Sequence, residues 1–177
     1  NPPTRISHRL FATSRSEMEI HMNTTDNLEQ FLPILRTASI FSGMSDSEIL
    51  SVLHCMGAFV SDKEKDSYLL RAGDMTSTMG LLLSGSAIVI QEDVWGHRNI
   101  MAQILPGQTF AEPFAASNGT ALNISVVVTK DCSLLYLDIH RILGVCPSAC
   151  EHHTHLIQNL ISVLAKKLLL FNEKITH

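Results

Sequence analysis

One carboxylate in the sequence stands among apolar neighbours, and it is the first residue whose chemistry needs explaining. Glu112 lies in the stretch ILPGQTFAEPF (104–114), shortly after a Pro-Gly turn and between Ala111 and Pro113. Burying an unpaired charge is costly, so a carboxylate in this setting needs a partner. We expect Glu112 to face a pocket and to hydrogen-bond a ligand hydroxyl or amine, or the local backbone. The alternative is that it only caps neighbouring N–H groups.

Thiols and imidazoles gather in the stretch CPSACEHHTH (146–155). On a helix, residues three or four apart share one face, and such groups can ligate zinc or another soft metal, or sense redox state. The alternative is small buried cysteines beside histidines on a solvated face. The spacing is not a CxxC pair and one helical face seldom supplies four ligands, so no firm metal site follows. The redox or metal candidates are Cys146, Cys150, His152, His153 and His155.

The overall composition is that of a globular protein and excludes several classes of function. Of the 177 residues, 45% are hydrophobic and 17% charged, and the net charge is −4, which argues against gripping a nucleic-acid backbone by charge alone. No apolar run reaches the roughly 18 residues of a membrane span, and no secretory signal is recognisable. We therefore expect a cytoplasmic protein with reduced thiols. Because no P-loop, Gly-x-Ser-x-Gly or HExxH motif occurs, we do not expect an enzyme.

Helical patterns occupy the N-terminal part of the chain. Residues 1–26 have an irregular composition and are interpreted as an arm outside the domain, while residues 27–38 carry leucines at helical spacing. The stretch after Met44 begins with Ser45, has Glu48 three residues later and places Ile49 next, which predicts a helix opened by a capping box and a hydrophobic staple.

Short apolar runs separated by glycine-containing turns follow from about residue 57 to residue 138. This pattern predicts β-strands, about eight in number, and no helical insert is long enough for a parallel βαβ unit. The fold class is therefore mainly β with flanking helices, as a double-stranded β-helix, or jelly-roll, barrel within residues 27–145.

Residues 146–177 are predicted to form one long helix that opens at Pro147. A seam of apolar residues recurs along it at alternating steps of four and three, which is the heptad spacing of a coiled coil. We expect this helix to form a homodimer; the alternative is that it packs on its own domain. The predicted dimer seam comprises Ile157, Ile161, Leu164, Leu168, Phe171 and Ile175.

The order of these motifs resembles the cyclic-nucleotide-binding fold of the cyclic-AMP receptor and fumarate-nitrate regulator (Crp/Fnr) family of bacterial transcription factors. The resemblance covers about residues 28–177 and rests on RAGD (71–74), LLSGSAIV (82–89), Gly96 and LPGQTFAE (105–112), which come in the family's order. It implies that Phe110 and Glu112 belong to a phosphate-binding cassette in which Ala111 replaces a glycine.

The cassette arginine that pairs with a cyclic phosphate in the family is missing. Its position falls on Leu122 or Asn123, and no Arg or Lys lies between Arg98 and Lys130. A phosphate would lose a charge-assisted hydrogen-bond pair, so we expect poor binding of cyclic AMP and cyclic GMP. The effector is instead a small molecule of unknown identity. The predicted ligand-binding residues are Phe110, Ala111, Glu112, Pro113, Leu122, Asn123 and Ser125.

The resemblance implies an effector-sensing domain of a homodimeric transcription regulator. DNA and RNA polymerase would be contacted through a helix-turn-helix domain that these 177 residues do not contain, and no membrane contact is expected. Two alternatives stay open: a stand-alone ligand-binding module of a channel, kinase or other regulatory protein, and a cupin-type metal-dependent β-barrel enzyme. The cupin reading is weakened because the clustered histidines lie in a predicted helix rather than on strands.

Overall fold

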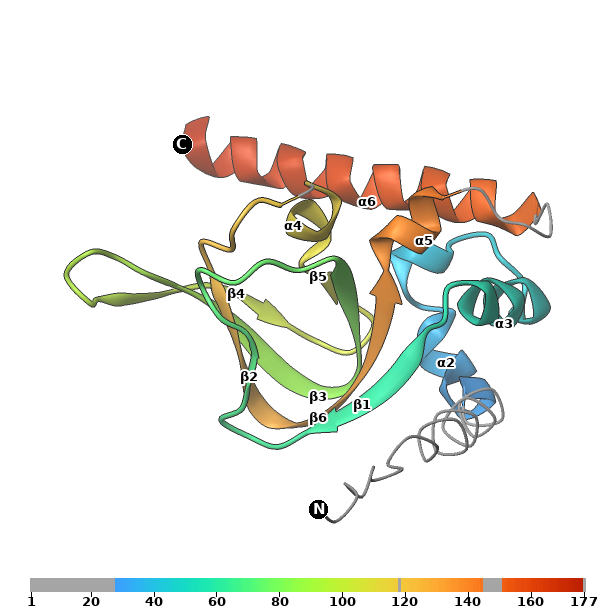
Figure 1. Cartoon of the computed structure of the whole chain (residues 1–177), viewed down its shortest axis with the longest axis horizontal. Helices are drawn as coiled ribbons and strands as arrows, with labels where there is room; N and C mark the ends of the chain where they lie inside the picture. Colours follow the sequence, from blue (N-terminus) through green and yellow to red (C-terminus); the bar gives the residue numbers. More distant parts are fainter. Residues whose placement is uncertain (1–27, 118, 145–150, 177) are drawn as a thin grey trace, which may run out of the picture.

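The computed structural model describes residues 28–117, 119–144 and 151–176, and it describes side chains in the last segment for residues 152–170. Antiparallel strands curl into a barrel, a long helix lies across one side of it, and shorter helices gather at one end (Figure 1). The predicted jelly-roll barrel followed by a long helix is therefore confirmed. The predicted arm at residues 1–26 lies outside the described residues.

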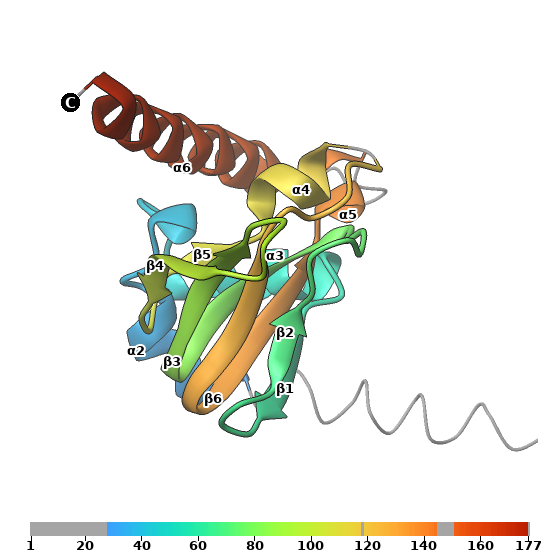
Figure 2. The same ribbon diagram turned by 90° about the vertical axis from the view of Figure 1, so that its left-hand side faces the viewer.

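Two long strands form the backbone of the barrel. Strand β3 (Thr78–Glu92) pairs with strand β6 (Ser125–Asp138), and the sheet runs in the order β1 (Phe59–Lys63), β6, β3, β4 (Arg98–Ile104). Two short strands complete it, because β2 (Tyr68–Leu70) pairs with β6 and β5 (Thr109–Phe110) pairs with β3. Figure 2 shows β3 and β6 curving side by side.

The described residues contain six strands rather than about eight, because β3 and β6 each continue through a bend. The register between them shifts on both sides of Ser84 and Ser86. Gly85 lies between these shifts with a φ of +83°, and a Cβ there would collide with the Asp131 carbonyl and with Cys132. The chain can turn at this point because glycine adopts positive φ without steric cost and lets the two backbones approach closely.

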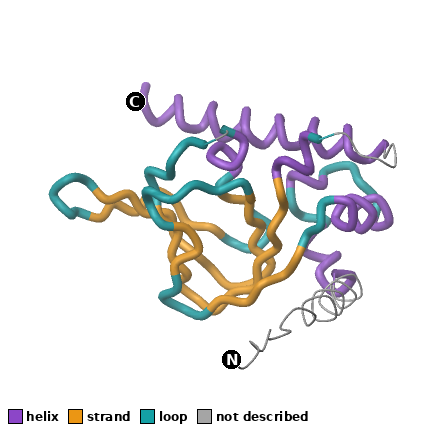
Figure 3. Tube along the Cα trace, viewed as in Figure 1, coloured by secondary structure: helices purple, strands orange, loops and turns teal. Residues whose placement is uncertain are grey.

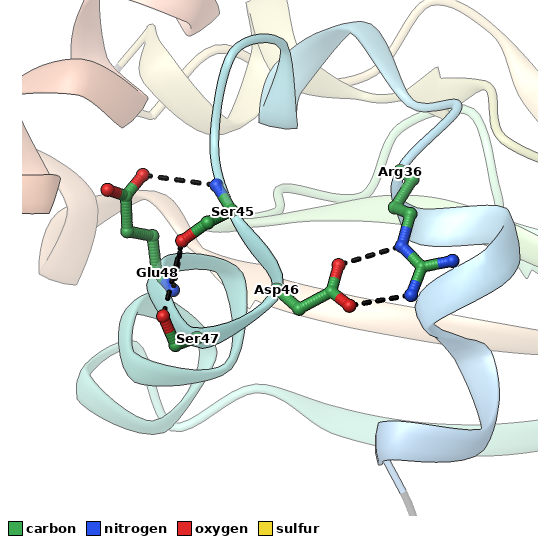
Figure 4. Close-up of polar contacts among 5 residues, drawn as sticks. All are labelled: Arg36, Ser45, Asp46, Ser47 and Glu48. Carbon is green, nitrogen blue, oxygen red and sulfur yellow. Dashed lines mark hydrogen bonds and ion pairs between the residues drawn. The ribbon is translucent and has the colours of Figure 1, made fainter.

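The N-terminal helices are short and strongly fixed. The predicted helix at 27–38 appears as a 3₁₀ turn, η1 (Glu29–Phe31), followed by α2 (Leu32–Leu35), since Pro33 is tolerated only in a first helical turn. Helix α3 (Asp46–Cys55) begins with the predicted capping box: the Ser45 N–H donates to Glu48 at 3.2 Å, and the Glu48 N–H donates to Ser45 Oγ at 3.4 Å (Figure 4).

A paired guanidinium and carboxylate join α2 to α3. Arg36, directly after α2, donates from Nε and Nη2 to the two oxygens of Asp46 at 2.7 and 2.6 Å (Figure 4). This hydrogen-bonded guanidinium holds the pKa of the Asp46 carboxyl below its usual value. The pair spans the turn η2 (Ser39–Phe41), which connects the two helices.

The long helix α6 (Glu151–Thr176) covers the barrel and the short helices α4 (Glu112–Ala116) and α5 (Ile139–Leu143) (Figures 1 and 3). Its inner face carries Leu156, Leu160 and Val163, which are all buried. Leu156 and Leu160 join a core shared with η2, α3, α5 and one end of the barrel. A second apolar core fills the barrel beneath β5 and α4, and it includes Leu82, Ala87, Ile104, Phe110, Val126, Val128 and Leu134.

Polar contacts fix α6 at its middle as well. Asn159 donates from Nδ2 to the Ile40 carbonyl at 3.0 Å and to the Ser42 carbonyl at 2.9 Å. These carbonyls belong to or directly follow η2, so the helix is tied to the N-terminal turn by hydrogen bonds beside its apolar face. Among the described residues, no helix is both long enough and apolar enough to cross a membrane.

Candidate functional site

The segment singled out in the sequence forms a sharp turn from strand to helix. Strand β5 ends at Phe110, Ala111 adopts a left-handed conformation with a φ of 69°, and α4 begins at Glu112 with Pro113 in its first turn. A residue with a Cβ is strained in this conformation by about 1–2 kcal/mol, which explains why glycine is the residue that such a turn favours. Ala111 therefore adopts the left-handed conformation at a steric cost that glycine would not have.

Glu112 is almost completely buried, with 1% of its surface exposed, and its partner lies 55 residues further along the chain. Lys167 of α6 donates from Nζ to Glu112 Oε1 at 2.7 Å and to the Thr109 carbonyl at 2.8 Å. The lysine side chain remains 42% exposed, so the pair sits at the edge of the buried region. The carboxylate thus has the partner that its burial requires, and that partner ties α4 and β5 to α6.

A pocket of about 680 Å³ opens beside this ion pair. Its wall is made by β3, β4, β5, β6, η2, α4 and α6 together with nearby loops, and Phe110, Ala111, Glu112 and Pro113 all contribute to it. These four are among the residues that the sequence predicted for ligand binding. A pocket of this volume falls within the range typical of small-molecule sites, which is about 300–1,000 Å³.

The other predicted ligand residues do not line this pocket. Leu122 is buried, and its backbone pairs with the RAGD turn: its N–H donates to the Asp74 carbonyl at 2.8 Å and its carbonyl accepts from Gly73 N–H at 2.7 Å. Asn123 is exposed, and Ser125 Oγ accepts from the Ala72 N–H at 2.9 Å. In this region the wall is formed instead by the apolar side chains of Ile124 and Val126.

The three described histidines of the Cys/His stretch do not converge. His153 is buried and donates from Nε2 to the Arg141 carbonyl at 2.9 Å, whereas His152 Nδ1 lies 3.9 Å from Glu48 Oε1 and His155 lies beside Gly43. Within the described ranges no group of three potential metal ligands forms. Cys146 and Cys150 lie outside the described residues, so the proposed redox or metal role stays a prediction.

The predicted seam of α6 divides into two environments. Ile157 and Leu164 are partly buried against the domain's own core, which agrees with the alternative that the helix packs on its own domain. Ile161 and Leu168 are 61% and 60% exposed, and Leu169 and Leu170 beside them are 63% and 60% exposed. The side chains of Phe171 and Ile175 lie outside the described residues. The helix therefore has one apolar face turned inward and further apolar residues turned outward.

Lys167 was not among the predicted site residues, because the sequence prediction for this helix concerned the seam through Ile157, Ile161 and Leu168. The inward face of α6 runs through His153, Leu156, Leu160 and Val163, and one further step of four reaches Lys167. A lysine at the next position of a buried apolar stripe indicates that a carboxylate lies opposite it. The predicted seam contains Ile157 and Ile161, which directly follow Leu156 and Leu160, so it runs beside the buried stripe and does not include Lys167.

Comparison with known proteins agrees with this arrangement of barrel, cassette and long helix. Residues 62–148 match the family model described as "Cyclic nucleotide-binding domain". This segment, just under half of the chain, is similar to the cyclic nucleotide-binding domain family. A comparison with curated proteins gave no match.

Several solved structures share the fold of this cyclic nucleotide-binding domain, at identities low enough that fold alone is implied. A domain of this family from Methylobacillus flagellatus is 18% identical over 86% of this chain and 84% of its own, with a TM-score of 0.70. The Thermus thermophilus catabolite activator protein is 19% identical over 78% of this chain, with a TM-score of 0.68. The sensor domain of the transcriptional regulator DNR from Pseudomonas aeruginosa is 15% identical over 86% of this chain and 94% of its own, with a TM-score of 0.60.

The present chain spans 62% of the length of the catabolite activator protein. The resemblance to sensor domains of transcription regulators, drawn from the sequence, is thus confirmed at the level of the fold.

Proposed function

We propose that this chain is the effector-sensing domain of a homodimeric transcription regulator, and that its effector is neither cyclic AMP nor cyclic GMP. One observation carries the proposal: Glu112, in the wall of the pocket, is hydrogen-bonded to Lys167 of α6 at 2.7 Å. A ligand that enters the pocket meets both side chains, so it changes the contact between the barrel and the long helix. A ligand that favours one arrangement of α6 over another shifts the population of the two.

The expectation that cyclic nucleotides do not bind rests on the residues at the position of the cassette arginine. Leu122 is buried and its side chain does not line the pocket, and neither it nor exposed Asn123 brings a positive charge to the cassette. Isothermal titration calorimetry of the chain with cyclic AMP and with cyclic GMP tests this part. We expect no heat of binding at micromolar ligand, and a dissociation constant in the micromolar range or below for either nucleotide would contradict it.

Dimerisation is supported by the outward apolar residues of α6. Ile161 and Leu168 are seven residues apart, or two helical turns, so they lie on one face, and each is about 60% exposed. Sedimentation analysis of the wild-type chain should give a dimer, and Leu168→Glu should give a monomer. Ser162→Glu is the matched control, because Ser162 is an exposed residue of the same helix outside the seam. A wild-type monomer, or a Leu168→Glu variant that dimerises as well as wild type, would refute this part.

The DNA-binding role belongs to the whole regulator and is inferred from the similarity to transcription regulators. The net charge of −4 argues against these 177 residues gripping a nucleic-acid backbone by charge alone. An electrophoretic mobility shift with this chain alone should give no specific complex, whereas the chain extended by its own helix-turn-helix domain should give one.

A further inference from the structure

The pocket beside Glu112 has an apolar body. Aromatic rings of Phe110 and Phe114 and aliphatic side chains from several strands make up most of its wall, among them Val89, Ile104, Ile124 and Val126. A ligand that fills this space gains free energy by removing apolar surface from water, roughly 25 cal/mol for each Å². The bulk of the ligand is therefore apolar, and its polar group has to lie where the wall is polar.

Charge in the wall is confined to one side. Among the described residues that line the pocket, Glu112, Lys166 and Lys167 are the charged ones, and both lysines come from α6. Lys167 is engaged by Glu112, while Lys166 makes no hydrogen bond or ion pair with any described residue. The three charges add to one surplus positive charge, and it sits on the helix rather than on the cassette.

This arrangement differs from a site built for a phosphate. A cyclic phosphate would lie at the start of α4, where Glu112 supplies a negative charge and Leu122 supplies no positive one. An anion placed there would face the Glu112 carboxylate, whose neighbouring cation, Lys167, is already paired with it. An anion at the α6 side instead meets Lys166 directly and competes with Glu112 for Lys167.

We propose that the pocket binds a small molecule with an apolar body and a single anionic group, with the anionic group held against Lys166 and Lys167. This inference rests on the proposed sensing function and names the ligand class for the same site. A medium-chain alkanoate and a bicyclic aromatic carboxylate both have this chemistry. When the anion takes Lys167, the Glu112–Lys167 contact opens, and ligand binding becomes linked to the position of α6.

Matched probes separate the charge from the apolar body. Octanoate, 1-octanol and octylammonium share one chain, and 1-naphthoate and 1-naphthol share one ring system. Titration calorimetry should show at least one of the two acids binding with one site per chain, about tenfold more tightly than its alcohol. Octylammonium should be the weakest of the eight-carbon series, because it brings a positive charge to the lysines.

Variants of the three charged residues then locate the anionic group. Lys166→Gln should weaken acid binding about fivefold, as expected for the loss of an exposed ion pair, and leave the alcohol unchanged. Glu112→Gln keeps the shape and the acceptor oxygen that Lys167 uses but removes the competing charge, so it should strengthen acid binding about tenfold. A merely structural role for Glu112 would weaken the acid and its alcohol alike.

A bulky side chain in the wall tests where the probe lies. Ala102 is an exposed residue of β4 that lines the pocket, so Ala102→Trp can fill it without disturbing the core. This variant should abolish acid binding; unchanged binding would overturn the proposal by placing the ligand elsewhere. If the alcohols bind as tightly as the acids, the ligand class is wrong while the sensing function stands. If no probe binds, charged or neutral, both proposals fall.

Discussion

The ring of Phe110 in β5 packs on the backbone of Gly80 in β3, at a place where any side chain on residue 80 would collide with the ring. The two residues are register partners in the sheet. Phe110 also lines the pocket, so the absence of a side chain on Gly80 sets the position of this ring in the pocket wall. The shape of the pocket therefore depends on a glycine that does not line it.

Gly80→Ala should destabilise the domain by about 1–3 kcal/mol, because the ring has to move within a packed core. It should also weaken binding of any ligand that contacts Phe110. Urea denaturation and calorimetry with the carboxylate probes check both effects. Gly73→Ala is a control for the loss of a glycine, since Gly73 has open space where a Cβ would be; its positive φ strains alanine, but the pocket is untouched. Unaltered stability of Gly80→Ala would contradict the contact.

Lys167→Met should lower the free energy of unfolding by about 1–3 kcal/mol, because it leaves the buried Glu112 carboxylate without its hydrogen-bonded partner. Methionine keeps the apolar length of the side chain, so packing changes little. Lys166→Met, one residue earlier, is the matched control and should lie within about 0.5 kcal/mol of wild type. Guanidinium denaturation measures both, and equal effects in the two variants would argue against the ion pair. The double variant Glu112→Gln with Lys167→Met should recover part of the loss.

Restoring the cassette arginine should not restore cyclic-nucleotide binding. Leu122 is buried, so Leu122→Arg places a charge without a described partner in the interior and should cost more than about 3 kcal/mol of stability. Asn123→Arg, at the exposed neighbour, should fold normally and still bind no cyclic AMP. Thermal unfolding and calorimetry test both variants. A stable Leu122→Arg protein that binds cyclic AMP would show that the pocket extends to that side chain.

The buried thiol of Cys132 should make the domain less stable in alkali. Burial raises the pKa of this thiol, and the nearby Asp131 and Asp62 raise it further. The folded state therefore keeps the proton after the unfolded chain has lost it. The contribution to stability is complete below the unfolded pKa of about 8.5 and is lost as the pH rises through the higher folded value.

Cys132→Val removes the titrating group and keeps an apolar side chain of similar size. Urea denaturation at about pH 7.5 and about pH 9.5 should show a larger fall in stability for wild type than for this variant. The comparison between the two proteins reduces the contribution of Tyr136 without removing it, because burial raises the pKa of Tyr136 and the Cys132 thiolate raises it further. Equal falls in the two proteins would mean that the thiol does not titrate differently on folding.

Local signals in the sequence were enough for much of the fold. The capping box at Ser45 and Glu48 depends on residues three positions apart. Strands bounded by glycine-containing turns are likewise recognisable from a few consecutive residues. The bend at Gly85 was harder to place, because only the approach of Asp131 and Cys132 from another strand shows that β3 continues through it.

The candidate site was predicted only in part, because its contacts also join residues that are far apart in the sequence. Burial of Glu112 could be foreseen from its apolar neighbours, whereas its partner is 55 residues away and depends on how α6 lies on the barrel. Two apolar stripes run along α6, and sequence spacing alone does not say which one faces inward. The choice is made by packing against η2 and α3, with Leu156 and Leu160 in the shared core.

The hydrogen bonds of Asn159 to the Ile40 and Ser42 carbonyls anchor α6 to the N-terminal turn, so Asn159 is the natural pivot for a tilt of this helix. Lys167 lies eight residues beyond the pivot, about 12 Å along the axis, and the helix continues to Thr176, about 25 Å beyond it. A tilt about Asn159 that shifts Lys167 moves the end of the helix roughly twice as far, by the ratio of the two arms. Under the proposed mechanism, opening the Glu112–Lys167 ion pair would therefore displace Thr176 further than Lys167.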